Sequence, residues 1–320
     1  MGSSIEKEQE YLDNVIKIMD EDISSFEETR DEGYEDVRQL SKYHWDTRSE
    51  MDYIEKAVTR NDVNHTASLT NTKIAILRKL KNARPNPFFG KIDVDFDGDQ
   101  ESFYIGKTSV LENNFPIVND WRSPISTLFY NSKIGNTSYK APAGIINCNL
   151  LQREQIKIKN DKIQRIVDTD IHLTDDELQK VLSKNSDGRM RNIVATIQEE
   201  QNVIIRDLQD PIIIVQGCAG SGKTSVALHR LSFLLYNDKK SSSENMLIFS
   251  PSDAFSTYIS TVLPDLGDDN VLQTTFSDFA NAFVKGFDHI ESYLEFLSRH
   301  HNLKDTRDKT ETELLARMNK

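Results

Sequence analysis

The chain of 320 residues has only two cysteines, Cys148 and Cys218, and no apolar run of 18 residues. Two cysteines cannot build a disulfide framework, so a cytosolic protein is the simplest expectation. Without a long apolar run, no membrane-spanning helix is expected. The first residues also lack the basic-then-apolar pattern of a secretory signal peptide. We therefore predict a cytoplasmic protein with no membrane partner.

Positively charged residues are fewer than negatively charged ones. The sequence has 39 Lys and Arg residues against 51 Asp and Glu residues, which gives a net charge of −12. A nucleic-acid surface over the whole chain is disfavoured, because phosphate binding needs local positive charge, although one basic groove is not excluded. The seven histidines form no H-E-x-x-H motif and no Cys/His ligand set, so no zinc site is predicted.

Proline is absent before Pro85, and the preceding residues show helical periodicity. Apolar residues recur in steps of four and three, as in the seam of a coiled coil, at Leu12, Ile16, Met19, Ile23 and Phe26. A similar pattern returns from Leu69 to Leu80. We predict an antiparallel helical hairpin over residues 1–84, with its tip between about Trp45 and Asn64. A turn at Gly33 or near residues 59–62 is the alternative.

The predicted hairpin is rich in acidic residues. Residues 1–60 contain 17 Asp and Glu residues but only 8 Lys and Arg residues. Charge on helices usually forms a solvated surface. The alternative is an acidic prong that enters a basic cavity of a partner protein.

Residues 85–170 are predicted to form a small β-rich module. Pro85 and Pro87 end the helix, and apolar residues then alternate with acidic ones from Ile92 to Phe96. The sequence Asp97-Gly98-Asp99 predicts a hairpin turn into a return strand. Further strands are expected at residues 126–130, 137–140, 145–151, 155–159 and 162–167.

The most specific signal lies in the third region, residues 171–320. The sequence from Gly217 to Thr224, G-C-A-G-S-G-K-T, matches the phosphate-binding pattern G-x-x-x-x-G-K-[ST]. It follows the apolar stretch 212–215, predicted to be a buried parallel strand, and precedes a helix at 225–236. In this order, backbone N–H groups and a helix N-terminus hold phosphate oxygens. We expect the nucleotide contacts to be Gly217, Cys218, Ala219, Gly220, Ser221, Gly222, Lys223 and Thr224. Lys223 would contact the β- and γ-phosphates and Thr224 would bind Mg²⁺, so these two are also the candidate catalytic residues.

The rest of this region predicts a parallel α/β arrangement. Thr174 and Glu177 have capping-box spacing, and a helix is expected from about residue 190 to 208. That helix carries Gln201, which could contact an adenine edge or simply be a surface residue. Strands are expected at 246–249 and 271–275, with a helix between them that is capped by residues 250–253. This βαβ order predicts a doubly wound parallel sheet.

A second acidic strand end, needed for Mg²⁺ and for orienting water, does not follow Phe249, and no arginine finger is identified. We therefore expect the chain to be the N-terminal portion of a larger motor. Whether it hydrolyses ATP on its own stays open.

Several segments resemble a known family. They are residues 193–206, 215–224, 227–230, 87–93, 104–106, 120–126, 249–252 and 262–267. They resemble superfamily 1 helicases of the UvrD/Rep type and, more closely, the HelD group of RNA polymerase-recycling ATPases of Gram-positive bacteria.

The resemblance implies an α/β fold: a P-loop NTPase parallel sheet, as a partial helicase domain 1A, with the N-terminal coiled-coil hairpin and the β-rich module. It implies ATP and Mg²⁺ as cofactors, with Gln201 at the adenine. The partner implied is RNA polymerase core, bound through residues 1–84 in its secondary channel, so that stalled polymerase is released from nucleic acid. Any nucleic-acid contact would be indirect, and Ser250-Pro251-Ser252 matches a strand-end motif that touches single strands in helicases. Tip residues Asp46, Glu50 and Asp52 are candidate polymerase contacts.

Two other functions remain open. The chain could belong to a DNA helicase or translocase of the UvrD/Rep type, in which the hairpin is a docking arm. It could also be a non-enzymatic binder of the polymerase channel with a relic motor.

Overall fold

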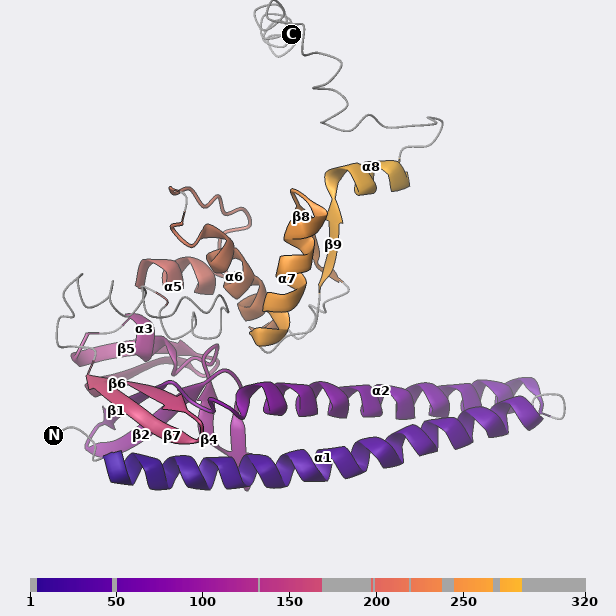
Figure 1. Ribbon diagram of the computed structural model, residues 1–320, viewed down its shortest axis with the longest axis horizontal. Coiled ribbons are helices and arrows are strands. Elements are labelled where there is room, and N and C mark those ends of the chain that lie inside the picture. Colours follow the sequence, from indigo (N-terminus) through magenta and orange to yellow (C-terminus); the bar gives the residue numbers. More distant parts are fainter. Residues whose placement is uncertain are drawn as a thin grey trace, which may run out of the picture. The chain divides into compact units, whose positions relative to one another are not determined.

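The computed structural model describes residues 5–47, 51–131, 133–168, 197, 199–218, 220–237, 245–266 and 271–283 (Figure 1). The chain divides into two compact units. The first comprises Met1–Ser243 and Ile259–Asn270, and the second comprises Glu244–Tyr258 and Val271–Lys320. No described helix is both long enough and apolar enough to cross a bilayer. The predicted capping box at Thr174 and Glu177 lies outside the described residues.

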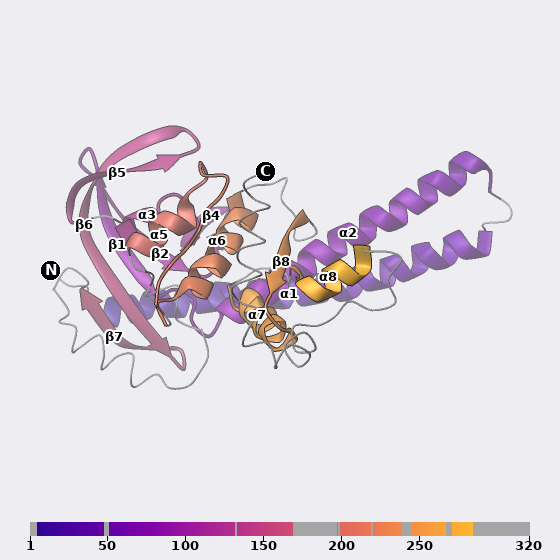
Figure 2. The same ribbon diagram turned by 90° about the horizontal axis from the view of Figure 1, so that it is seen from above.

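Two long helices, α1 (Ile5–Thr47) and α2 (Tyr53–Ala83), lie side by side as the predicted hairpin (Figures 1 and 2). At about 1.5 Å per residue, the 43 residues of α1 extend over about 65 Å. The connection between Thr47 and Tyr53 falls inside the predicted tip range, and the two alternative turns are wrong. Gly33 instead lies inside α1, where a Cβ atom would come within 2.6 Å of Thr70 Oγ1. Glycine at this position therefore lets the two helices approach closely.

The start of α2 is fixed by a capping box. The Asp52 carboxylate accepts a hydrogen bond from the backbone N–H of Glu55 at 2.8 Å, and the Glu55 carboxylate accepts one from the backbone N–H of Asp52 at 3.1 Å. Asp52 was expected to contact a partner, and its side chain has this structural role at the tip. Asp46 is exposed near the end of α1, and Glu50 lies outside the described residues.

The β-rich module is one seven-stranded sheet, antiparallel except where β2 and β4 pair. Its order is β3-β4-β2-β1-β6-β5, and β7 also pairs with the long strand β6. The strands are β1 (Gly90–Phe96), β2 (Asp99–Gly106), β3 (Val110–Glu112), β4 (Phe115–Asp120), β5 (Gly135–Ala141), β6 (Gly144–Lys159) and β7 (Lys162–Asp168). Asn160 and Asp161 both have positive φ, which suits a tight turn between β6 and β7.

Three details of the strand prediction are wrong. Residues 127–131 form a short helix, α3 (Thr127–Asn131), in place of a strand. Leu128, Phe129 and Tyr130 are all buried, whereas a half-buried strand would expose every second side chain. The break expected between Leu151 and Gln155 is absent because β6 is continuous, and β3 and β4 were not predicted.

The base of the hairpin shares one hydrophobic core with the sheet. Leu12, Val15 and Met19 of α1 are fully buried in a cluster that also includes Tyr104 of β2 and Ile156 of β6. Full burial of such side chains contributes roughly 1.5–3 kcal/mol each. All the buried residues of α1 lie within its first four turns, so the sheet anchors only one end of the hairpin.

A buried ionic group lies in the same interface. Fully buried Glu8 of α1 accepts hydrogen bonds from Lys91 Nζ at 3.1 Å and from the Tyr104 hydroxyl at 2.8 Å. The Tyr11 ring stacks on Tyr104 with centroids 3.8 Å apart, and the Tyr11 hydroxyl donates to the carbonyl of Ile117. Burial, together with the neighbouring Glu8 carboxylate, raises the pKa of Tyr104. These contacts fix the direction in which α1 leaves the sheet.

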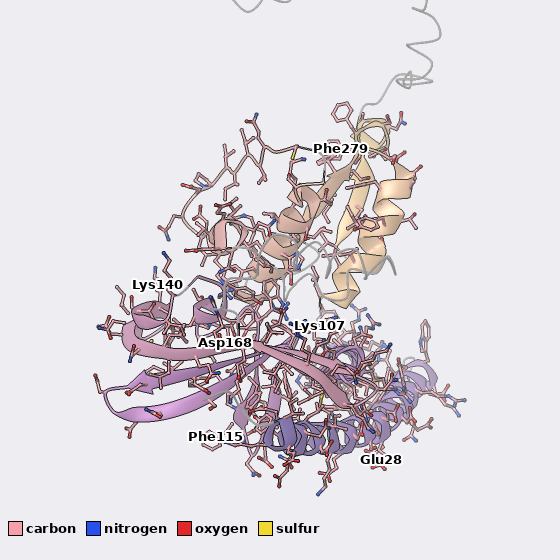
Figure 3. The ribbon with its side chains drawn as sticks, turned by 60° about the vertical axis from the view of Figure 1, so that its left-hand side comes forward. Glu28, Lys107, Phe115, Lys140, Asp168 and Phe279 are labelled. Carbon is pink, nitrogen blue, oxygen red and sulfur yellow. The ribbon has the colours of Figure 1, made fainter. Side chains whose placement is uncertain are left out.

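The second unit contains a two-stranded parallel sheet, β8 (Leu247–Ser250) and β9 (Leu272–Thr275), followed by α8 (Phe276–Phe283). Helix α7 (Asp253–Asp265) lies between the two strands in the sequence, so the predicted βαβ order is observed. Its residues from Ile259 onward belong to the first unit. The ring of Phe249 packs edge-to-face on that of Phe279, which is labelled in Figure 3.

The strand predicted before the phosphate-binding pattern is not formed. Residues 212–218 have no regular secondary structure, and Ile212 and Ile214 are 80% and 82% exposed. A strand exists only where a neighbour satisfies its backbone groups, and none of the described strands pairs with this segment. The larger doubly wound sheet is therefore not present among the described residues.

Glu8→Ala should lower the free energy of unfolding by about 3 kcal/mol, because it leaves the Lys91 ammonium buried without its closest carboxylate. Urea denaturation of the two proteins measures this difference. Glu10→Ala, on the exposed side of the same turn, is the control and should change stability by less than about 0.5 kcal/mol. Equal effects of the two substitutions would contradict the anchoring role of Glu8.

Candidate nucleotide-binding site

The segment from Gly217 to Thr224 forms a tight loop at the start of α6 (Lys223–Asn237). Gly220 and Gly222 have φ values of +85° and +82°, which only glycine adopts without strain. Lys223 Nζ donates hydrogen bonds to the carbonyls of Gly217 at 2.9 Å and Cys218 at 2.6 Å. The loop is therefore closed around the lysine ammonium.

These residues fit a phosphate group. The first N–H groups of a helix have no partner within the helix, and a negative charge is favoured there. The Val226 N–H donates to the Gly222 carbonyl at 2.9 Å, at the start of the helical hydrogen bonds of α6. The amides between Gly222 and Ser225 therefore precede the first helical bond, whereas the Ser221 amide donates to the Cys218 carbonyl at 3.3 Å. The Thr224 hydroxyl lies in this first turn. Ala219 lies outside the described residues.

Gln201 lies beside this loop, on α5 (Glu199–Arg206). A Cβ atom added to Gly222 would lie 3.1 Å from Gln201 Nε2, so the amide of Gln201 and the loop are neighbours. Gln201 and the loop of residues 217–224 are separate in the sequence, and both were predicted to contact a nucleotide. In the structure they are neighbours. The specific role of Gln201 stays a prediction.

Hydrogen bonds link helices α5 and α6. Arg230 of α6 donates from Nη1 to the carbonyl of Ile204 at 2.7 Å and to that of Asp207. The Ile204 carbonyl lies in the last turn of α5 and the Asp207 carbonyl directly follows that helix, where backbone carbonyls lack helical partners. The position of Gln201 is thereby tied to the helix that Lys223 begins.

A segment of the β-rich module holds both helices. We call Trp121, Arg122 and Ser123, which follow β4, the connecting loop. Arg122 is buried and its guanidinium pairs in bidentate fashion with Asp120, at 2.8 Å and 2.7 Å, while Nη1 donates to Ser232 Oγ of α6 at 3.1 Å. Buried bidentate pairs of this type have defined geometry.

Arg206 makes the matching connection from α5. Its guanidinium donates to the carbonyls of Trp121, Arg122 at 3.4 Å and Ser123 at 3.2 Å, and its Nε donates to Asn202 Oδ1 at 3.1 Å. Burial lowers the pKa of Arg206 to about 10, so the side chain stays charged at neutral pH. The connecting loop is therefore linked to α5 and to α6 by one arginine each.

His229 completes the contact between α6 and the connecting loop. It is fully buried, and its ring meets that of Trp121 edge-to-face at 5.5 Å. His229 Nδ1 lies 2.6 Å from the carbonyl of Ser225. A carbonyl only accepts, so Nδ1 carries the proton and Nε2 is an acceptor. Burial lowers the pKa of His229 to about 4 and keeps the ring neutral.

The motif Ser250-Pro251-Ser252 has a structural role in the second unit. Ser252 Oγ accepts a hydrogen bond from Phe255 N–H at 3.3 Å, and Ser250 Oγ bonds to Ser256 Oγ at 2.5 Å. These contacts cap α7, as the sequence predicted.

Comparison with known proteins identifies the family. A protein-family model, described as the N-terminal domain of DNA helicase IV HelD, matches residues 5–183, which is more than half of the chain. The chain belongs to this family, and its N-terminal part is of the HelD type. No curated protein matches the chain.

Sequence reasoning used residues 120–126 only as a sign of resemblance and missed their contact with α5 and α6. The available signal was a Trp-Arg pair that directly follows the Asp at the end of a strand. The pairing of Arg122 with an acid two residues earlier, and its burial against another segment, become apparent only in the folded chain.

The stability of the protein should fall between pH 6.5 and pH 4 through His229. The pKa of His229 is lowered to about 4 in the folded state, so the unfolded state binds more protons in this range. The loss amounts to about 3 kcal/mol at pH 4 relative to pH 7. Urea denaturation across this range should show a shallower decline for His229→Gln than for the parent.

His65→Gln is the control, because His65 is exposed on α2 and its replacement should leave the decline unchanged. Identical pH dependence of the parent and His229→Gln would show that His229 is not held neutral.

Proposed function

We propose that the chain is the ATP-binding N-terminal portion of a HelD-type, helicase-like motor. In this proposal the hairpin of residues 1–84 binds the secondary channel of RNA polymerase core, and the motor helps to release stalled polymerase from nucleic acid. The observation that carries the proposal is the position of Gln201 beside a glycine loop that closes around Lys223, in a chain whose N-terminal part is of the HelD type.

The chemistry of the loop supports a nucleoside triphosphate. The Lys223 ammonium would leave the carbonyls of Gly217 and Cys218 and donate to the β- and γ-phosphate oxygens. The amides at the start of α6 would hold the same oxygens. The Thr224 hydroxyl would bind Mg²⁺, and the Gln201 amide would pair with the adenine edge. Mg²⁺ neutralises the phosphate charge when it is bound. The proposal concerns ATP binding, since hydrolysis needs a second acidic group.

The form of the hairpin supports insertion into a partner. Its buried residues are confined to the base and the mutual contact of the two helices. The tip exposes aromatic side chains, with Trp45 68% and Tyr53 87% accessible to solvent. Tryptophan and tyrosine are enriched among residues that dominate binding energy. Acidic residues along the shaft suit a basic channel, because complementary charge steers association.

The family description names a DNA helicase, which favours duplex unwinding as a second candidate. A strand-displacement assay with ATP separates the two functions. Unwinding by this chain in the absence of polymerase would support the second candidate over the first.

Lys223→Ala should weaken ATP binding by about 10- to 100-fold. The substitution removes a charge-assisted hydrogen bond of about 1.5–3 kcal/mol. Isothermal titration with Mg-ATP measures both affinities. Lys17→Ala, at a largely exposed lysine of α1, is the control and should bind like the parent. Equal affinity of Lys223→Ala and the parent would remove the phosphate role of the loop.

A hairpin shortened at its distal end should lose binding to core RNA polymerase in a pull-down. Gly33 and Thr70 are in contact, so residues 34–69 can be replaced by a short Gly-Ser linker without touching the anchored base. Trp45→Ala should weaken binding by about tenfold or more, in the range of interface hot spots.

Tyr34→Ala, an exposed aromatic on the shaft, is the matched control for Trp45→Ala and should bind normally. Full binding by the shortened chain, with unchanged thermal stability, would contradict insertion of the hairpin.

A further inference from the structure

The structure contains a continuous set of contacts from the candidate nucleotide site to the base of the hairpin. It begins in α6, where Ser232 accepts from Arg122 of the connecting loop. Arg122 pairs with Asp120, the last residue of β4. The Trp121 N–H donates to the carbonyl of Gly106, the last residue of β2, at 2.9 Å.

The second half of the route passes through β2. Strands β2 and β4 are parallel partners, with Tyr104 opposite Val118. The Tyr104 hydroxyl donates to Glu8 of α1, and its ring stacks on Tyr11. Ser232, Arg122, Asp120, Tyr104 and Glu8 form, with the backbone of these two strands, a set of buried contacts from α6 to α1. Packed elements of this type transmit displacement, because close-packed interiors deform little.

Two buried side chains on the route, Trp121 and His229, each have a ring nitrogen without a hydrogen-bond partner among the described residues. These nitrogens are Trp121 Nε1 and His229 Nε2. The first is a donor, and the second is an acceptor because Nδ1 of the same ring donates to Ser225. Buried polar groups are rarely left without a partner, and the two rings already touch. The two nitrogens are thus a donor and an acceptor on neighbouring rings, each without a partner among the described residues.

The loop of residues 217–224 provides a reason for a displacement of α6. Lys223 is engaged with two carbonyls of its own loop and must leave them to hold phosphate oxygens. Ser225 and His229 lie on the first two turns of the same helix, so rearrangement of the loop acts directly on them.

We propose that the connecting loop couples nucleotide binding to the hairpin: ATP shifts α6, Trp121 Nε1–H then donates to His229 Nε2, and β4 and β2 carry the shift to Glu8 and Tyr11. The inference rests on the proposed binding of ATP at Lys223. It assigns Arg122, Trp121 and His229 as positioning residues that do not touch the nucleotide.

Trp121 itself supplies the readout. The chain has two tryptophans, and the other, Trp45, is exposed at the tip. In the full chain with Trp45→Phe, emission excited at tryptophan wavelengths reports on Trp121 alone. Mg-ATP should change this emission with the same midpoint as the binding isotherm from calorimetry. Lys223→Ala in this background should show no change at the same nucleotide concentrations.

His229→Phe in the same background keeps a ring against Trp121 but removes the acceptor. It should lose the emission change at saturating Mg-ATP and bind ATP about fivefold more weakly, the effect of one neutral hydrogen bond. An emission change equal to that of the parent would overturn the role of the Trp121–His229 pair.

Hydrogen exchange tests transmission to α1. At saturating Mg-ATP, with occupancy verified by calorimetry, the parent should change its exchange rates at residues 8–19. Ser232→Ala, which removes one contact of the route and leaves the Arg122–Asp120 pair intact, should reduce that change at least twofold. Bound ATP with no change at residues 8–19 in the parent would overturn the coupling alone. No calorimetric binding by the parent would overturn the proposed function, and the coupling with it.

Discussion

A lysine on a covered face of the sheet sets the arrangement of the first unit. Lys91 of β1 is buried, and a buried ammonium is tolerated only beside an anion. Glu8 provides the closest carboxylate, so the first turn of α1 lies beside the start of β1, and Tyr104 and Tyr11 pack around the pair. The opposite face of β1 is covered by α3, where the Phe129 ring fills the space above Gly90. A sheet covered on both faces leaves little freedom for the direction of the hairpin.

The same sheet also presents the candidate nucleotide site. Arg122 and Arg206 connect the end of β4 to the two helices that bear Lys223 and Gln201. The helices that carry the candidate nucleotide loop are thus held by residues of the HelD-type N-terminal part of the chain. Buried hydrogen bonds therefore connect α6, through β4 and β2, to the base of α1, and the proposed coupling depends on them.

Periodicity and turn chemistry predicted the hairpin, its tip and most of the antiparallel strands, because these features depend on local patterns. The short apolar run at residues 126–130 was assigned to the wrong element, since a run of that length does not distinguish helix from strand. The strand predicted at residues 212–215 is not formed for another reason. Its apolar residues fit a strand, but a strand needs a neighbouring strand to satisfy its backbone groups. The burial of Glu8 and Arg122 could not be predicted, because a buried charge looks like a surface charge until the segments around it are known. Glu8 pairs with Lys91, 83 residues away. Arg122 pairs with the nearby Asp120, but the α6 residue that it contacts, Ser232, is 110 residues away.

The central claim is that the loop with Lys223 binds the phosphates of ATP while Gln201 contacts its adenine base. Photolabelling with 2-azidoadenosine triphosphate, followed by peptide mapping, tests it most directly, because the azide lies on the adenine ring. The account predicts that the label falls on the peptide containing residues 199–206 and that excess ATP prevents it. Label that ATP displaces from a different part of the chain, with residues 199–206 unmodified, would contradict the assignment.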